Sequence, residues 1–454
     1  MPEKPEDLKT QYKTVMDDHF PRYMRISFGN DLSGKMQDLI YEKVTWIVDD
    51  PDKGPVKKGL RYGDNPPQES VIYRLVNGNL VLGNVRHIEP GNGLVTDFTM
   101  EQAGKHPGRI NLTDTDNALN MLRHFRGKPT AVFVKHNNPC GVGRRGTLPE
   151  AFEAGYLADR LAAFGGVVAV NMPLDIETAE LITKDKSRYF EVVAAPEFED
   201  GTLKILSKKK NLRVLRIDNM KRLQDYIGQR FIDFKSLMDG GQCVQWSYVP
   251  TPSMKWKKAE TEFKDKTYVI KREPTPDEMV DLDFGWLVES GITSNSIIYV
   301  KDETTIGIGT GEQDRVGVAE AARDKAYRKM ADRICFEKYG VKYNDLLQKA
   351  GLKQHLPSQI TPIDLKSVRD YEAVGRLVEI DDEVTACNGG LLGARMISDA
   401  FFPFRDGVDV GIAEGITAVA HAGGSERDFE SIVACNEAEP PVAMIFTGER
   451  SFKH

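Results

Sequence analysis

Residues 130–141 read TAVFVKHNNPCG and combine a strand signal with a turn signal. The β-branched and aromatic run before Lys135 predicts a strand, and the Asn-Asn-Pro-Cys-Gly sequence after His136 predicts a sharp turn at its end. An ammonium and an imidazole therefore stand together at the end of a strand, where α/β proteins commonly bind ligands. Lysine offers a positive donor and histidine titrates near neutral pH, so the pair suits proton transfer. A solvated Lys-His pair in a surface loop is the alternative interpretation.

Strand-like and helix-like segments alternate after this stretch. A Thr-x-x-Glu capping box predicts a helix over 151–163, and a Gly-Gly turn then leads into a buried strand that ends at Val170. A helix over 176–183 and a strand over 192–196 come next. This alternation predicts a mainly parallel α/β unit.

A second α/β unit is predicted to start near Lys271. The sequence Thr-Pro-Asp-Glu at 275–278 supplies an N-cap, an N1 proline and an N3 glutamate for a helix that Gly291 ends. The strand expected over 296–301 ends in lysine, like the strand that ends at Lys135. We therefore predict an internal duplication of one α/β unit.

The predicted organisation has three parts. Residues 1–58 form an N-terminal extension that ends in a linker near 49–55. The first unit covers 59–270. The second unit covers 271–454 and contains a charged, loop-rich insertion with helical segments over about 332–395.

The composition is that of a soluble globular protein, with 40% hydrophobic and 28% charged residues. A net charge of −7 disfavours a broad basic surface for nucleic acid. No apolar run approaches the roughly 20 residues that span a bilayer, and the N-terminus lacks the apolar core of a signal peptide. Five scattered cysteines without a Cys-x-x-Cys pair predict reduced thiols in the cytoplasm and give no support for a cysteine-rich zinc site.

Further motifs carry donors or aromatic rings, and each alone is compatible with a structural role. The turn RYGDNPPQ at 61–68 offers an arginine for phosphate and a tyrosine for stacking on a planar base. The run IGIGTG at 306–311 precedes a helix and could cradle an anion, although its spacing does not match a dinucleotide fingerprint. The cluster FFPFRD at 401–406 could form an apolar slot with polar ends for a flat heterocycle, with a core cluster as the commoner outcome.

These motifs occur together, and in the same order, in one known family. Over about residues 59–454 the chain resembles the transformylase part of the bifunctional purine-biosynthesis enzymes. Those enzymes join 5-aminoimidazole-4-carboxamide ribonucleotide (AICAR) formyltransferase to inosine-monophosphate (IMP) cyclohydrolase. The matching segments are Arg61 to Gln68, Asn111, Lys135 to Gly141, Ala163 to Ala169, Ser294 to Val316, Asp399 to Asp406 and Arg450 to His454.

The resemblance implies a fold of two cytidine-deaminase-like α/β units in tandem. It also implies a homodimer whose sites are shared between chains. The zinc chemistry of deaminases is not expected, because no His-x-Glu accompanies a Pro-Cys-x-x-Cys. No catalytic metal is implied, and a structural monovalent cation is left open.

The resemblance further implies formyl transfer from 10-formyltetrahydrofolate to the 5-amino group of AICAR. His136 would assist deprotonation of the amine, and Lys135 would stabilise developing charge or protonate the leaving folate nitrogen. Asn295 would orient the formyl oxygen and the carboxamide. Residues expected to contact AICAR are Arg61, Tyr62, Asn111, Phe164, Gly165, Pro403, Phe404, Asp406, Arg450 and Phe452. Those expected on the folate side are Gln313, Asp314, Arg315 and Val316.

The chain departs from the family pattern at two motifs and in its length. It has Pro67 where the family has a histidine, and Asp314 where a neutral serine is common. The added acid at Asp314 would disfavour an anionic folate unless it pairs with a positive group. Only about 58 residues precede the Arg-Tyr-Gly turn, too few for the cyclohydrolase domain, so a monofunctional formyltransferase is expected.

Two other interpretations stay open. A hydrolase or transamidase could use Cys140 as nucleophile and His136 as base, although the two residues lie four apart in one turn. A non-catalytic relative could bind purine nucleotides and regulate or scaffold the pathway. The retained set of Lys135, His136 and Asn295 argues against the second interpretation.

Overall fold

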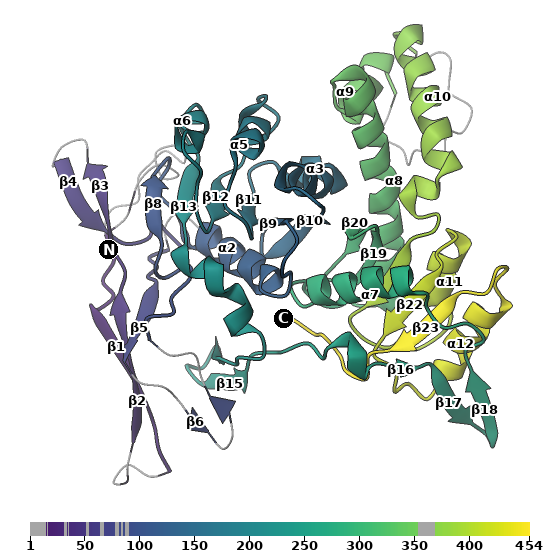
Figure 1. Cartoon of the computed structure of the whole chain (residues 1–454), viewed down its shortest axis with the longest axis horizontal. Helices are drawn as coiled ribbons and strands as arrows, with labels where there is room; N and C mark the ends of the chain where they lie inside the picture. The colour runs from purple at the N-terminus through teal and green to yellow at the C-terminus, as the bar shows by residue number, and fades with distance from the viewer. Residues whose placement is uncertain are drawn as a thin grey trace. The chain divides into compact units, whose positions relative to one another are not determined.

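The computed structural model divides the chain into two compact units, each with its own helices and sheet (Figure 1). The first unit comprises 1–137, 147–149 and 164–249, and the second comprises 138–146, 150–163 and 250–454. The boundary between the units lies after residue 249, not at 270 as predicted. In addition, residues 138–146 and 150–163 belong to the second unit. The structure describes residues 15, 17–30, 34, 36–50, 54–63, 68–77, 81–82, 85–86, 90–352 and 368–454.

The main sheet of the first unit has the strand order β9-β11-β12-β13-β8. Its three middle strands are parallel, whereas β9 and β8 run antiparallel to their neighbours. The predicted parallel arrangement is confirmed for β11 and β12, the strands from which it was drawn, but it does not extend to β9 and β8, so the sheet is mixed. The strands are β8 (Thr99–Gln102), β9 (Thr130–Lys135), β11 (Val167–Val170), β12 (Val192–Ala195) and β13 (Arg213–Arg216). The helices are α2 (Arg109–Leu122), α5 (Ile176–Thr183), α6 (Thr202–Leu206) and the 3-10 helix η1 (Asp218–Tyr226).

The smaller strands of the first unit form antiparallel ribbons. The expected linker near 49–55 overlaps the hairpin of β3 and β4, in which Asp50 pairs with Gly54. Trp46, Ile47 and Val48 favour a strand here, and their β propensity outweighs the loop signal of the following Asp and Pro residues. The strands are β1 (Tyr23–Phe28), β2 (Gln37–Lys43), β3 (Trp46–Asp50), β4 (Gly54–Lys58), β5 (Tyr73–Asn77), β6 (Val81–Leu82), β7 (Val85–Arg86), β14 (Ile232–Ser236) and β15 (Gln242–Trp246).

The sheet of the second unit has the order β16-β23-β22-β21-β19-β20-β10. Its strands β21, β22 and β23 are parallel, and β19 runs antiparallel to both β21 and β20. The strands are β10 (Asn138–Arg144), β16 (Lys257–Lys258), β17 (Glu260–Phe263), β18 (Lys266–Val269), β19 (Ile297–Lys301), β20 (Thr304–Gly309), β21 (Arg395–Ser398), β22 (Ala418–His421) and β23 (Ala443–Phe446). The helices are α3 (Leu148–Ala158), α4 (Arg160–Ala163), η2 (Ser253–Lys255), α7 (Pro276–Glu289), α8 (Arg315–Tyr339), α9 (Tyr343–Ala350), α10 (Tyr371–Ala386), η4 (Asn388–Gly390), α11 (Asp406–Ala413) and α12 (Asp428–Glu437).

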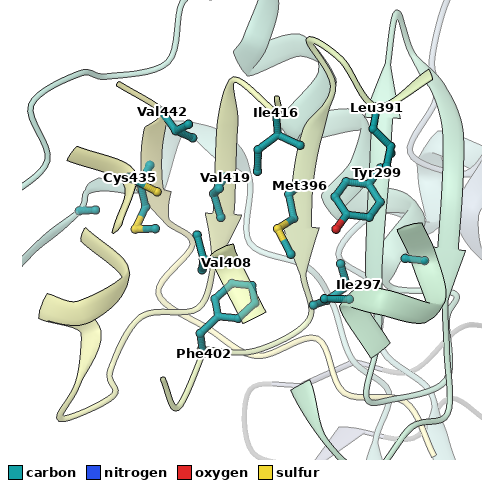
Figure 2. Close-up of a cluster of buried hydrophobic side chains, with 14 of the residues drawn as sticks. Ile297, Tyr299, Leu391, Met396, Phe402, Val408, Ile416, Val419, Cys435 and Val442 are labelled. Carbon is teal, nitrogen blue, oxygen red and sulfur yellow. The ribbon is translucent and has the colours of Figure 1, made fainter. Parts of the chain in front are cut away.

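Buried side chains from neighbouring strands build the core of the second unit. Tyr299, Met396 and Val419 lie at paired positions of β19, β21 and β22, so they point to one face of the sheet (Figure 2). Phe402 and Val408 are fully buried in the same cluster. The part of the predicted insertion that the structure describes is helical rather than loop-rich. Its helices α9 and α10 pack with α8 around a separate apolar cluster.

The two halves of the sequence share one order of elements. The order α2, β9, two-residue turn, β10, α3 in the first half recurs as α7, β19, two-residue turn, β20, α8 in the second. Three parallel strands follow in each case, and the first of them runs antiparallel to β9 or β19. This repeated topology supports the predicted internal duplication. The cytidine-deaminase-like identity of the units stays a prediction.

Glycines let β20 run unusually close to α8. A Cβ added at Gly307 would lie 2.3 Å from the carbonyl oxygen of Ala322, and one at Gly309 would lie 2.3 Å from that of Val318. Both partners are backbone atoms, which cannot move aside without shifting the helix. The glycines of the IGIGTG run thus have a packing role that explains them without an anion.

We expect Gly307→Ala to lower the free energy of unfolding by about 1–3 kcal/mol, because the strand and helix must separate. Gly375 lies in α10 with no atom within 4 Å of an added Cβ. Gly375→Ala should instead raise the free energy by about 0.5–1 kcal/mol through better helix propensity. Thermal midpoints of both variants measure the two effects. Equal shifts would contradict the close strand–helix packing.

Candidate active site

The strand β9 ends in a tight turn that carries His136. His136 and Asn137 have φ angles of 53° and 60°, and β10 begins at the next residue. Two successive positive φ values are the geometry of a type I′ turn. The sharp turn is thus confirmed, but it is shorter than predicted, because Asn138 to Gly141 belong to the following strand. His136 is exposed and Lys135 is half-buried.

Side chains of helix α2 in the first unit hydrogen-bond to the backbone of this turn. The buried carboxylate of Asp114 accepts hydrogen bonds from the backbone N–H groups of His136, at 3.1 Å, and Asn137, at 2.6 Å. The Asn117 side chain donates to the carbonyl oxygen of Asn137 at 2.9 Å. A left-handed conformation costs a non-glycine residue about 1–2 kcal/mol, and a hydrogen bond to a charged acceptor contributes about 1.5–3 kcal/mol. The carboxylate therefore offsets the cost of the turn.

Lys135 is oriented toward two other predicted residues. Its Nζ donates a hydrogen bond to the carbonyl oxygen of Phe164 at 2.8 Å. Gly165 follows with a φ of 78°, and a Cβ there would lie 3.9 Å from Nζ of Lys135 and from the ring of Tyr189. The rings of Phe164 and Tyr189 have centroids 5.2 Å apart. The first unit thus brings Lys135, Phe164 and Gly165 together, and their roles in catalysis and AICAR binding stay predictions.

A second group of predicted residues gathers at the start of α2. The guanidinium of Arg61 lies 4.5 Å from the ring centroid of Tyr62, and Arg61 is buried. Asn111 accepts a hydrogen bond from the Gly108 N–H at 3.0 Å and donates one to Glu191 at 2.8 Å. Asp64 to Pro67 lie outside the described residues, so the effect of Pro67 stays untested.

Sequence reasoning missed two charged residues next to this group. Arg213 on β13 is fully buried and pairs with Glu191 at 3.3 Å. The pKa of Arg213 is lowered to about 10, mainly by burial; Glu191 opposes this shift and the charge of Arg61 adds to it. Arg213 begins the four-residue strand Arg-Val-Leu-Arg, and no local pattern marks it as buried. Glu191 therefore links Asn111 to Arg213, and the charge of Arg61 acts on Arg213; we call these four residues the Arg61 network.

In the second unit, Arg315 orients Asn295. Its Nη2 donates to the Asn295 side-chain oxygen at 3.0 Å, and the Asn295 amide donates to the carbonyl oxygen of Gln313 at 3.2 Å. Arg315 also binds the carboxylate of Asp399 and the Ser398 hydroxyl, the latter at 3.0 Å. The guanidinium is buried and used internally. A direct contact between Arg315 and folate stays a prediction.

Asp314 caps α8. One of its side-chain oxygens accepts a hydrogen bond from the Gly317 N–H at 2.6 Å. The positive end of the helix dipole therefore faces this carboxylate, which reduces the electrostatic objection raised by an acid at this position. Gln313 is exposed and Val316 is partly buried.

The residues of the predicted apolar slot lie partly in the core and partly on the surface. Phe402 is fully buried, whereas Pro403 and Phe404 are exposed. The guanidinium of Arg427 lies 4.9 Å from the ring centroid of Phe404, and Asp406 accepts from the Gly407 N–H at 2.8 Å. The core interpretation thus holds for Phe402, and the exposed residues keep their predicted role as an expectation.

The C-terminal segment lies beside the Ser-Asn-Ser sequence. The Ser294 N–H donates to the carbonyl oxygen of Lys453 at 2.9 Å, and the Lys453 N–H donates back to the Ser294 hydroxyl at 3.2 Å. The Arg450 guanidinium lies 5.0 Å from the ring centroid of Phe452. The second unit therefore places Arg450 and Phe452 on a segment tied to the residue before Asn295.

Two buried carboxylates flank Ser296. Glu289 accepts from the Ser296 hydroxyl at 2.8 Å, and Asp399 accepts from the Ser296 N–H at 3.0 Å. Burial raises the pKa of Glu289 well above its ordinary value, and the Asp399 charge raises it further. Glu289 therefore favours its protonated form.

The described part of the chain has neither a cluster of metal-ligand side chains nor a membrane-spanning helix. No group of three or more His, Cys, Asp or Glu residues there could hold a metal ion. No helix there is long and apolar enough to cross a bilayer.

Comparison with known proteins supports the family resemblance. The model of the AICARFT/IMPCHase bienzyme family matches residues 43–325. The chain belongs to this family. Within it, the bifunctional purine biosynthesis protein PurH of Ruegeria sp. (strain TM1040) is 35% identical over 405 residues, which cover 88% of this chain and 60% of that protein. The protein of the same name from Acetivibrio thermocellus is 30% identical over 460 aligned positions, covering 99% of this chain and 69% of the relative.

The chain aligns with only part of each relative. The protein PurH of Chlorobium phaeobacteroides is 32% identical over 400 residues, covering 87% of this chain and 59% of the relative. The chain thus spans about three fifths of most of these curated relatives. Family membership supports a role in purine biosynthesis, and the activities of the longer relatives come to this chain as proposals.

We expect the stability of the protein to depend on pH through Glu289. A carboxyl with a raised folded-state pKa contributes its stability below the ordinary value of about 4.3 and loses it as pH rises toward the folded pKa. Glu289→Gln keeps an oxygen acceptor for Ser296 and does not titrate. Its thermal midpoint relative to wild type should therefore rise between pH 5 and pH 8. A difference that is constant or falls over this range would contradict the assignment.

Proposed function

We propose that the chain transfers a formyl group from 10-formyltetrahydrofolate to the 5-amino group of AICAR, giving formyl-AICAR and tetrahydrofolate. The observation that carries the proposal is the Lys135–His136 pair, held at the end of β9 in a member of the AICARFT/IMPCHase family. Phe164 and Gly165 beside Lys135, and the Arg61 network on the same unit, add support.

The proposed reaction is an acyl transfer between two nitrogens. The AICAR amine attacks the formyl carbon, and a tetrahedral intermediate forms with a negative oxygen. The C–N bond to the folate nitrogen then breaks and regenerates the carbonyl. His136 takes the proton that the amine loses, and the folate nitrogen gains a proton as it leaves. The AICAR amine is a weak nucleophile because it is conjugated with the imidazole, so the base is needed.

Lys135 and Asn295 are proposed to stabilise charge. The Lys135 ammonium is aimed by its hydrogen bond to Phe164, so it can face a developing oxyanion or protonate the leaving nitrogen without first reorganising. Asn295 is held by Arg315, which fixes the direction of its amide. The amide can then orient the formyl oxygen and the carboxamide of AICAR.

Binding roles follow from charge and shape. Arg61 and Arg450 are proposed to meet the nucleotide and its phosphate, because guanidinium groups bind phosphate through two parallel hydrogen bonds. The residues proposed to line the AICAR pocket are Tyr62, Asn111, Phe164, Gly165, Pro403, Phe404, Asp406 and Phe452. Those proposed on the folate side are Gln313, Asp314, Arg315 and Val316. A cytoplasmic homodimer, with sites shared between chains, belongs to the same proposal.

Replacing His136 with alanine should lower kcat about 10²–10⁴-fold in a spectroscopic assay with AICAR and 10-formyltetrahydrofolate, because the general base is lost. Lys135→Met should also lower kcat. Lys301→Met is the matched control, since Lys301 ends β19 as Lys135 ends β9. We expect the control to keep wild-type activity.

The same assay separates the alternatives. Cys140→Ala should leave activity intact, whereas a thiol nucleophile would require its loss. A wild-type protein that binds AICAR without turnover would support the non-catalytic relative and overturn the proposal. Equal turnover by wild type and His136→Ala would remove the role of His136 alone.

The monofunctional character of the 454-residue polypeptide stays a prediction. We expect purified protein to accumulate formyl-AICAR and not to convert it to IMP faster than buffer does. Chromatographic measurement of IMP from added formyl-AICAR tests this directly. Faster ring closure, proportional to protein concentration, would show cyclohydrolase activity in this polypeptide.

A further inference from the structure

We propose that Asp114 is a positioning residue for the formyl transfer. Its carboxylate holds the left-handed turn at 136–137 and so sets the direction of the Lys135 and His136 side chains. This inference rests on the proposed function, because the pair must be catalytic for its direction to matter.

The carboxylate of Asp114 binds the backbone N–H groups of both residues of the turn. One carboxylate oxygen accepts the His136 N–H at 3.1 Å and the other accepts the Asn137 N–H at 2.6 Å. Neither residue is glycine, yet both have positive φ. A type I′ turn normally uses an Asn-Gly or similar pair, so the sequence His-Asn needs an external support. The carboxylate provides that support at the residue proposed as general base.

In the second unit, an aspartate supports a turn in the same way. Asp281 is buried and accepts the N–H groups of Asp302, at 3.1 Å, and Glu303, at 2.7 Å. Asp302 and Glu303 also have positive φ, of 51° and 49°. Asp114 and Asp281 each occupy the sixth position of their helices, α2 and α7.

The lysines of the two units are oriented in the same way. Lys301 Nζ donates to the carbonyl oxygen of Leu392 at 2.9 Å, as Lys135 Nζ donates to that of Phe164 at 2.8 Å. Gly393 and Gly165 follow these carbonyls with φ angles of 76° and 78°. The difference lies at the next position of the turn, where Asp302 stands in place of His136. The second turn therefore has the same support without an imidazole.

This pair of sites provides a matched experiment. Asp114→Asn keeps the size of the side chain but turns one acceptor oxygen into an N–H donor that faces another donor. Asp281→Asn makes the same change at the turn without histidine. Because a small displacement of a catalytic group costs up to about 10²-fold, we expect Asp114→Asn to lower kcat about 10–100-fold. The KM for AICAR should change far less. Asp281→Asn should keep the wild-type kcat.

A rescue variant separates positioning from general loss of structure. Glycine adopts positive φ freely, so Asn137→Gly supports the turn without the carboxylate. The double variant Asp114→Asn/Asn137→Gly should have a kcat close to that of Asn137→Gly alone. Most of the loss of kcat caused by Asp114→Asn should thus be recovered. Hydrogen–deuterium exchange of the peptide containing residues 136–137 should be roughly tenfold or more faster in Asp114→Asn, and slower again in the double variant.

The outcomes are distinguishable from failure of the proposed function. If wild type does not turn over, the formyl-transfer proposal fails, and with it the catalytic meaning of the turn. If wild type is active and depends on His136, an unchanged kcat in Asp114→Asn overturns the positioning role. Equal losses of kcat in Asp114→Asn and Asp281→Asn, or no rescue by Asn137→Gly, would show a structural role only.

Discussion

A buried carboxylate that accepts two successive backbone N–H groups is the interaction on which the candidate site depends. Asp114 places it under the turn at His136 and Asn137, where the backbone is left-handed without glycine. Removing the carboxylate from water is costly, and the two N–H groups compensate for that cost by hydrogen bonding to its charge. The carboxylate therefore stabilises the turn and keeps Lys135 and His136, the pair proposed to be catalytic, at the strand end.

The repeated topology extends this constraint to the second unit. Asp281 supports an equivalent turn, and Lys301 ends the equivalent strand. Close strand–helix packing recurs as well, since glycines on both β10 and β20 lie against helix backbone. One architecture thus occurs with two different turn sequences. Under the proposed function, formyl transfer depends on the side chain that the turn carries, whereas the aspartate that supports the turn is present in both units.

Charge is arranged differently in the two units. In the first, the buried Arg213 pairs with Glu191, and the buried Arg61 lies close enough for its charge to lower the pKa of Arg213. Two cations with a single carboxylate suit an anionic substrate. In the second, a single guanidinium, Arg315, joins Asp399 to Asn295. An arginine committed to this internal network orients an amide more effectively than it attracts a ligand.

Local signals in the sequence determined the elements that carry the motifs. The strand before Lys135 and the capping box at 275–278 are short-range patterns, and the structure confirms both. Sheet direction and the burial of Arg213 were decided by tertiary structure, because they depend on partners outside the local sequence. The support of the turn by Asp114 belongs to the same class. No local pattern joins residues 22 and 23 positions apart, and only the packing of α2 beneath β9 brings that carboxylate to the two N–H groups.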